Sequence, residues 1–185
     1  EIDRIVEMLD LLPKEKRPHF EVGLSTAFGC SLEGKIADEK IAEIAEKVIA
    51  AGCDEVGLSD TTGSANPTQV RHLIKLVRSA VGSDKLTGVH LHNTRGLGLA
   101  NALAALEEGI TTLDSSLGGL GGCPAAPGAS GNIVTEDLVF MLESMGLNTG
   151  IDIHKLLSVR QTLSETIAGE SLFGFTAEAG LPLGY

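Results

Sequence analysis

Short apolar segments alternate with amphipathic helical segments along most of the chain, and this alternation constrains the fold more than any other feature. Four segments have the length and apolar content of strands, at residues 20–25, 55–59, 87–92 and 110–115. Each is followed by a segment with helical periodicity, at residues 38–51, 66–81, 97–108 and 135–145. A strand–helix repeat of about 30 residues returns each strand parallel to the one before. The sequence therefore predicts an α/β fold with a parallel sheet.

Residues that start and stop helices support these boundaries. Asn66 followed by Pro67 is typical of an N-cap and a first helical position. Asp38, Thr135 and Asp152 are also expected to be N-caps, the last for a helix that runs to about residue 168. Residues 1–12 have the pattern of the end of a helix, and the tail from Gly169 is expected to be a loop.

Four strand–helix units amount to half of a TIM (β/α)8 barrel. Half a barrel leaves two parallel edges unpaired, which proteins avoid, so we expect an N-terminal half to precede this chain. The start at Glu1, without methionine and within a helical pattern, agrees with this expectation. Residues 1–185 would then be the C-terminal part of a single barrel domain. A complete open sheet is the alternative.

Composition excludes several functional classes. The formal net charge of −11 argues against nucleic acid and anionic membrane surfaces, which both require a cationic face. No apolar run approaches the roughly 20 residues of a membrane span. The three cysteines form no CxxC motif, so a disulfide framework is not expected and a reducing cytoplasm fits best. Cys30 and Cys53 are expected to be core thiols.

The most specific chemical motif is the pair His90 and His92, at the end of the third strand segment. Because side chains alternate along a strand, the two imidazoles face the same side. The C-terminal ends of barrel strands form the catalytic rim of a TIM barrel. Two imidazoles on one face at that rim favour a divalent metal site. A structural pair of histidines is the alternative.

Three other residues of catalytic type lie near strand ends. Cys123 follows four glycines in the loop 118–131, where a thiol could donate or accept a proton. Asn132 offers a neutral oxygen that suits Mg²⁺ or Mn²⁺, and Asp60 could orient a ligand or act as a base. The structural alternatives are ordinary turns for Cys123 and Asn132, and a loop carboxylate that accepts hydrogen bonds from nearby amides for Asp60.

These motifs resemble the 3-hydroxy-3-methylglutaryl-CoA lyase family, which belongs to the metal-dependent lyase, aldolase and synthase superfamily built on TIM barrels. The likeness covers nearly the whole chain, and the glycine–cysteine signature separates the lyases from their synthase relatives. The residues that carry it are Gly29-Cys30, Glu33 to Ile36, Asp60-Thr61, His90-Leu91-His92, Leu99-Ala100-Asn101, Asp114-Ser115-Ser116, Gly118 to Pro124, Pro127 to Asn132 and Thr135-Glu136-Asp137.

The resemblance implies a role for each candidate residue. It implies that His90, His92 and Asn132 bind a divalent metal, Mg²⁺ or Mn²⁺. It implies that Cys123 is the catalytic thiol, and that Asp60 assists acid–base chemistry. An Asp ligand and an Arg on the first barrel strand of the family are absent from this chain, so the chain alone is expected to be inactive.

The resemblance also implies an activity. It is the retro-Claisen cleavage of 3-hydroxy-3-methylglutaryl-CoA to acetoacetate and acetyl-CoA, by a homodimer that binds an acyl-CoA. Asn93 stands where the family usually has Asp, and Arg95 stands where it often has Tyr. These two differences leave the identity of the acyl group open. The alternatives are a lyase for a related substrate such as citramalyl-CoA, a synthase or aldolase of the superfamily, and a non-enzymatic fragment.

Overall fold

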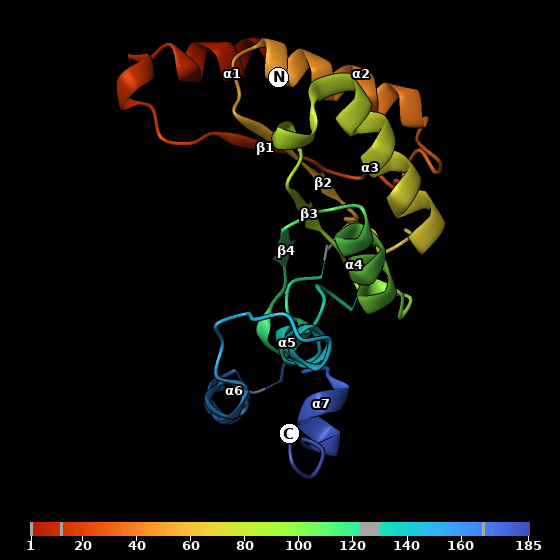
Figure 1. Cartoon of the computed structure of the whole chain (residues 1–185), viewed down its shortest axis with the longest axis vertical. Coiled ribbons are helices and arrows are strands. Elements are labelled where there is room, and N and C mark those ends of the chain that lie inside the picture. Colours follow the sequence, from red (N-terminus) through yellow and green to blue (C-terminus); the bar gives the residue numbers. More distant parts are fainter. Residues whose placement is uncertain (1, 12, 123–129, 168) are drawn as a thin grey trace.

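A parallel sheet lies at the centre of the computed structural model, which describes residues 2–11, 13–122, 130–167 and 169–185 (Figure 1). In this part of the chain the sheet has four strands in the order β1-β2-β3-β4. The strands are β1 (Glu21–Leu24), β2 (Glu55–Ser59), β3 (Gly88–His90) and β4 (Thr112–Asp114). Each strand pairs in parallel with the next one along the chain, so the predicted parallel α/β sheet is confirmed.

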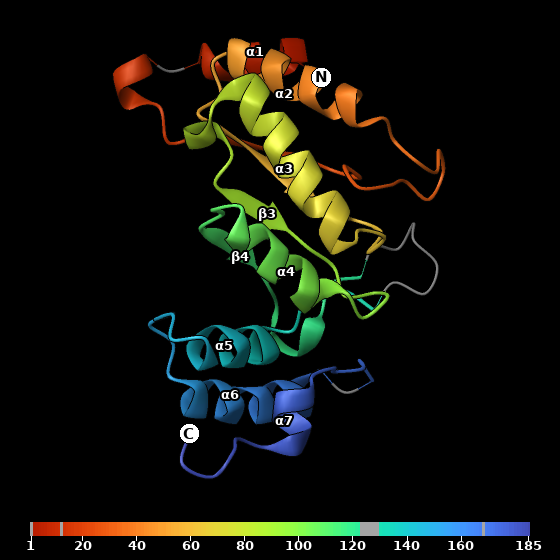
Figure 2. The same ribbon diagram turned by 45° about the vertical axis from the view of Figure 1, so that its right-hand side comes forward.

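Three helices connect the strands and lie on one face of the sheet (Figure 2). They are α2 (Asp38–Ala50), α3 (Pro67–Val81) and α4 (Gly98–Glu107). The core between helices and sheet is aliphatic, as buried parallel sheets usually are. Its fully buried side chains include Val48, Val56, Leu58, Val70, Leu73, Ile74, Val77 and Leu91.

The remaining helices flank this unit. They are α1 (Ile2–Leu9), α5 (Thr135–Ser144), α6 (Ile153–Thr166), α7 (Phe175–Ala179) and the 3₁₀ turns Lys14–Lys16, Ser83–Lys85 and Leu117–Gly119. The prediction of a loop throughout the tail is wrong, because α7 lies in it. The carboxylate of Asp137 accepts hydrogen bonds from the amides of Phe175 and Thr176, at 3.0 and 2.7 Å. A contact between distant segments therefore starts this short helix.

Two of the four predicted N-caps are confirmed. The side chain of Asn66 accepts a hydrogen bond from the Gln69 amide at 3.0 Å, and that of Asp152 accepts one from the Lys155 amide at 3.1 Å. Both side chains satisfy amides that the helix itself leaves without acceptors.

The N-cap predictions for Asp38 and Thr135 are wrong, because both residues are the first residues inside their helices. Their side chains make tertiary contacts instead. Asp38 pairs with His72, with 3.3 Å between Oδ2 and Nε2. The Thr135 hydroxyl donates to Ser115 Oγ at 2.9 Å. Among the described residues, no helix is long and apolar enough to cross a bilayer.

Candidate functional site

The sheet face opposite the helices holds a groove of about 410 Å³ that reaches the C-terminal end of β3. Its lining is glycine or polar except at Val89. The lining residues are Glu21, Gly23, Ser25, Gly57, Ser59, Thr61, Gly88, Val89, His90, His92, Thr112 and Asp114. Alternation along the strands puts the aliphatic side chains against the helices and these side chains in the groove. The groove therefore suits a polar ligand.

His90 and His92 lie together in this groove, as the sequence predicts. Their Nε2 atoms are 3.1 Å apart, and the two rings meet edge to face. Two bonds of about 2.1 Å from a cation to nitrogen, at roughly a right angle, separate the nitrogens by about 3 Å. The imidazoles therefore fit two adjacent positions around one divalent cation. Burial, and then the neighbouring His90, lowers the pKa of His92, which favours the neutral form that binds metals.

Asp114 holds the ring of His90 from the far side. The strand register pairs the two residues, and Asp114 Oδ2 lies 3.2 Å from His90 Nδ1. A carboxylate on the outer nitrogen of a ligating histidine fixes the tautomer and the ring orientation. The sequence pattern does not predict this role, because the motif contains Asp114 but not the strand register that places it beside His90.

Asn132 lies opposite His92 in an isolated antiparallel bridge. The hydrogen bonds from Asn93 N to Gly131 O and from Ile133 N to Leu91 O make it a non-hydrogen-bonded pair, the kind with the closest side chains. The Asn132 amide nitrogen donates to Leu120 O at 2.7 Å.

Two buried polar atoms at this site, Asn132 Oδ1 and His92 Nδ1, have no hydrogen-bond partner in the described part of the chain. Buried polar atoms are rarely left unpaired, and a cation would satisfy the amide oxygen. His90, His92 and Asn132 thus fit a divalent metal. Among the described residues there is no cluster of three or more His, Cys, Asp or Glu that could hold one. The ligand roles therefore stay predictions.

Asp60 is buried next to this groove but does not line it. Its Oδ1 accepts hydrogen bonds from the amides of Ser64 and Ala65, at 2.8 and 3.2 Å. Burial raises the pKa of the Asp60 carboxyl, opposed by these two amides and by the charges of Arg95 and His90. The structure thus shows the contacts of a loop carboxylate, and the acid–base role stays a prediction.

Cys123, the predicted catalytic thiol, lies outside the described residues. Of the other two cysteines, Cys53 is buried as predicted, but the prediction that Cys30 is a core thiol is wrong. Cys30 is half-buried at the wall of a second cavity. The short bridge between Cys30 and Gly34 turns the chain there, before it reaches α2.

This second cavity, of about 680 Å³, is the larger one and lies among the loops that follow β1, β2 and β3. Lys35, His72 and Arg95 line it together with Asp38, whose carboxylate pairs with His72. Arg95 Nη1 donates to the carbonyls of Thr62 and Gly63, at 3.0 and 2.9 Å. Arg95 therefore ties two of these loops together.

Most of this chain is similar in sequence to known proteins. The family model described as HMGL-like matches residues 3–163. The (R)-citramalyl-CoA lyase of Chloroflexus aurantiacus is 44% identical over 161 residues, which cover 87% of this chain and 50% of that protein. The hydroxymethylglutaryl-CoA lyase of Bacillus subtilis is 44% identical over 142 residues, covering 77% and 47%.

A solved structure of an HMG-CoA lyase from Acinetobacter baumannii, in complex with coenzyme A and 3-methylmalate, matches with a TM-score of 0.87 at 43% identity. The match covers 98% of this chain and 57% of that one. This chain spans about half the length of the curated relatives it matches. The predicted fold, strand–helix units of a TIM barrel rather than a complete open sheet, is thereby confirmed.

Proposed function

Because this chain belongs to the HMGL-like family, we propose that the protein containing it is a divalent-metal-dependent lyase that cleaves 3-hydroxy-3-methylglutaryl-CoA to acetoacetate and acetyl-CoA. The observation that carries this proposal is the groove in which His90 and His92 share one face beside Asn132. Relatives named as lyases of two 3-hydroxy-acyl-CoA compounds support the same reaction class.

His90, His92 and Asn132 would hold Mg²⁺ or Mn²⁺, which ligands of this kind accept. When bound, the cation would lower the pKa of the substrate's 3-hydroxyl group. Asp114 would keep the His90 ring oriented, and the polar walls of the groove would face the carboxylate of the acyl group.

In the proposed reaction the 3-hydroxyl proton passes to a base, and the C2–C3 bond breaks. The C3–O bond becomes a carbonyl, and the bonding electron pair stays on C2 as the enolate of acetyl-CoA. Asp60 is proposed as the base, because its raised pKa suits a proton acceptor. It would first release a hydrogen bond from the Ser64 or Ala65 amide. Cys123 is proposed to return a proton to C2.

The larger cavity is proposed to take the anionic coenzyme A portion of the substrate. Lys35 and Arg95 reach it from two of the loops on the rim of the sheet that also carries the histidines. Two cations can pair with phosphate oxygens there. A cytoplasmic location and a homodimer complete the proposal, and they rest on the cysteine content and the family resemblance respectively.

The second candidate function is the cleavage of citramalyl-CoA, because a citramalyl-CoA lyase is as similar to this chain as the hydroxymethylglutaryl-CoA lyase. Assays of the full-length gene product with both acyl-CoA substrates, with Mg²⁺ or Mn²⁺, would separate the two functions. Preference for citramalyl-CoA would favour the second candidate.

For the metal-dependent reaction itself we predict that His92→Ala lowers kcat/KM at least about 100-fold, since even an outer-sphere partner of a metal site contributes 10–100-fold. His154→Ala, an exposed histidine on α6, is the matched control and should behave like the wild type. Chelator-resistant cleavage, or full activity in His92→Ala, would contradict the proposal.

A further inference from the structure

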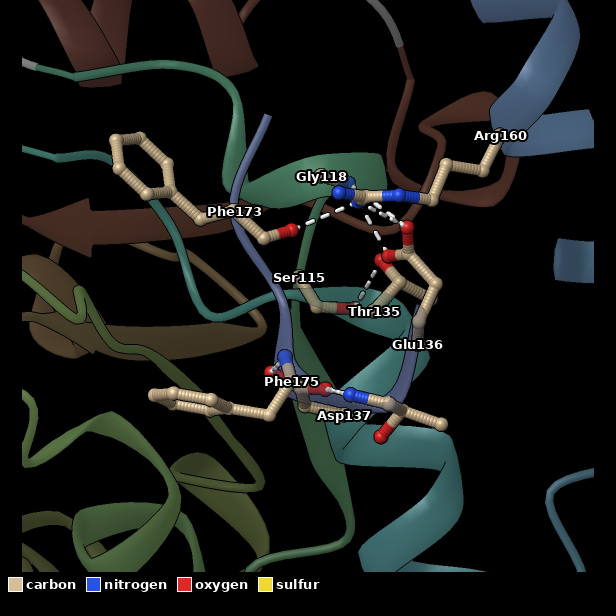
Figure 3. Close-up of polar contacts among 9 residues, drawn as sticks. Ser115, Gly118, Thr135, Glu136, Asp137, Arg160, Phe173 and Phe175 are labelled. Atoms are coloured by element: carbon tan, nitrogen blue, oxygen red, sulfur yellow. Dashed lines mark hydrogen bonds and ion pairs between the residues drawn. The ribbon is translucent and has the colours of Figure 1, made fainter. Parts of the chain in front are cut away.

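A buried ion pair joins α5 to α6 (Figure 3). Arg160 Nη1 donates to Glu136 Oε1 at 2.7 Å, and the side chains are 14% and 0% exposed. Removing two charges from water is costly unless other hydrogen bonds complete the pair. The other hydrogen bonds of Arg160 and Glu136 therefore indicate which part of the chain the ion pair holds in place.

The pair holds Gly118, in the 3₁₀ turn that follows β4. Both Glu136 oxygens accept from the Gly118 amide, at 3.2 and 3.1 Å. Arg160 Nη1 also donates to the Phe173 carbonyl at 2.7 Å, and the Phe173 amide donates to Gly118 O at 2.8 Å. Figure 3 shows the guanidinium between the Phe173 carbonyl and the Glu136 carboxylate. Both backbone polar groups of Gly118 are thus fixed through Arg160 and its partners.

The same turn orients the side-chain amide of Asn132. The Leu120 carbonyl, two residues after Gly118, accepts from Ser116 Oγ at 2.5 Å and from Asn132 Nδ2 at 2.7 Å. Gly118 has φ +62°, a left-handed conformation that glycine adopts without strain. A Cβ on Gly131 would collide with the Gly119 carbonyl, so the two backbones are in direct contact. A shift of the turn must therefore reach Asn132.

A different residue anchors the start of α7. Asp137, the neighbour of Glu136, accepts from the amides of Phe175 and Thr176 and so fastens α7 to α5 (Figure 3). The contacts of Glu136 lead instead to Gly118, on the turn beside Asn132.

We propose that Arg160 is a positioning residue for the candidate metal site. It holds Glu136 on Gly118, fixes the turn from Ser116 to Leu120, and so keeps the Asn132 nitrogen on Leu120 and the Asn132 oxygen free for the cation. This proposal rests on the proposed function, because it assigns the Asn132 oxygen to a metal.

The test compares Arg160→Met with Arg71→Met in the full-length gene product. Arg71 also forms an ion pair at 2.6 Å, with Glu107, but on the outer surface between α3 and α4. We expect Arg160→Met to raise the dissociation constant for Mn²⁺, measured by calorimetry, about tenfold, at the low end for residues behind metal ligands. The amides of the turn should also exchange hydrogen faster. Arg71→Met should change neither quantity.

A purely structural role would lower the melting temperature of Arg160→Met but leave the Mn²⁺ affinity of the folded molecules unchanged. That result would overturn the proposal. Arg160→Lys, which retains the charge but not the planar guanidinium, should bind Mn²⁺ more tightly than Arg160→Met. Equal binding by these two variants would count against the proposal.

Arg160→Met leaves a carboxylate buried without its partner and could fail to fold. The double variant Glu136→Gln with Arg160→Met removes both charges and keeps an acceptor for the Gly118 amide. It should still bind Mn²⁺ more weakly than the wild type, and wild-type affinity in it would overturn the proposal. A wild-type protein that binds no Mn²⁺ would overturn the proposed function as well, which separates the two failures.

Discussion

Cys30 and Cys53 show how strongly the surroundings of two residues of the same type differ within this fold. Cys53 is 4% exposed, and burial, followed by the charge of Asp54, raises the pKa of its thiol. Cys30 is half-buried at the wall of the larger cavity, where its sulfur accepts from the Leu32 amide at 3.4 Å. Since the thiolate is the reactive form, the two cysteines should differ in reactivity.

We predict that iodoacetamide alkylates Cys30 in the native protein well before Cys53. Burial keeps the reagent away from the Cys53 sulfur, and the raised pKa of this thiol lowers its thiolate fraction. Both effects slow the reaction of Cys53. Mass spectrometry of peptides over a time course would measure the two rates, and the unfolded protein, in which both thiols should react alike, is the control. Equal rates in the native state would contradict the burial of Cys53.

At the scale of elements, α3 is the helix whose start is best defined by local sequence. Asn66 caps it, and Pro67 occupies its first position, where no amide donor is needed. Its buried side chains, Val70, Leu73, Ile74 and Val77, repeat at helical spacing and face the sheet. Each of these signals depends on residues within one or two turns, which is why the sequence predicts this element well.

We predict that Asn66→Ala lowers the free energy of unfolding by about 1 kcal/mol, because one amide at the start of α3 loses its acceptor. Urea denaturation followed by circular dichroism would measure the change. Asn66→Asp retains a capping oxygen and should stay close to the wild type. A loss as large in Asn66→Asp as in Asn66→Ala would show that the cap is not the cause.

At the scale of the whole molecule, one aliphatic core joins the sheet to α2, α3 and α4. Its members alternate along the strands, and the opposite side of each strand contributes to the polar groove. The same alternation therefore serves stability on one face and the candidate site on the other.

We predict that Leu73→Ala, in the middle of this core and fully buried, lowers the free energy of unfolding by about 2–5 kcal/mol. Leu32→Ala, at a leucine that is 88% exposed, should change it little. Denaturation of both variants under the same conditions would measure the difference. A small loss for Leu73→Ala would mean that the helices do not pack on the sheet as described.

The tail and two of the predicted N-caps are the places where local sequence patterns predict the wrong secondary structure. Thr135 has the side chain of an N-cap, but it contacts Ser115, twenty residues earlier. The tail has no strong helical pattern, and yet α7 forms where Asp137 accepts its first amides. In both cases a partner far away in the sequence decides the local conformation, and local patterns contain no information about such partners.

The order of strands and helices, the aliphatic core and the shared face of His90 and His92 follow from the sequence alone, since alternation and helical spacing act between near neighbours. Tertiary structure alone decided that Asp114 meets His90, that Asn132 lies opposite His92, and that Arg160 reaches Glu136. These contacts depend on strand register and on the packing of distant segments. Many partners are compatible with the same local pattern, and only the folded chain selects one.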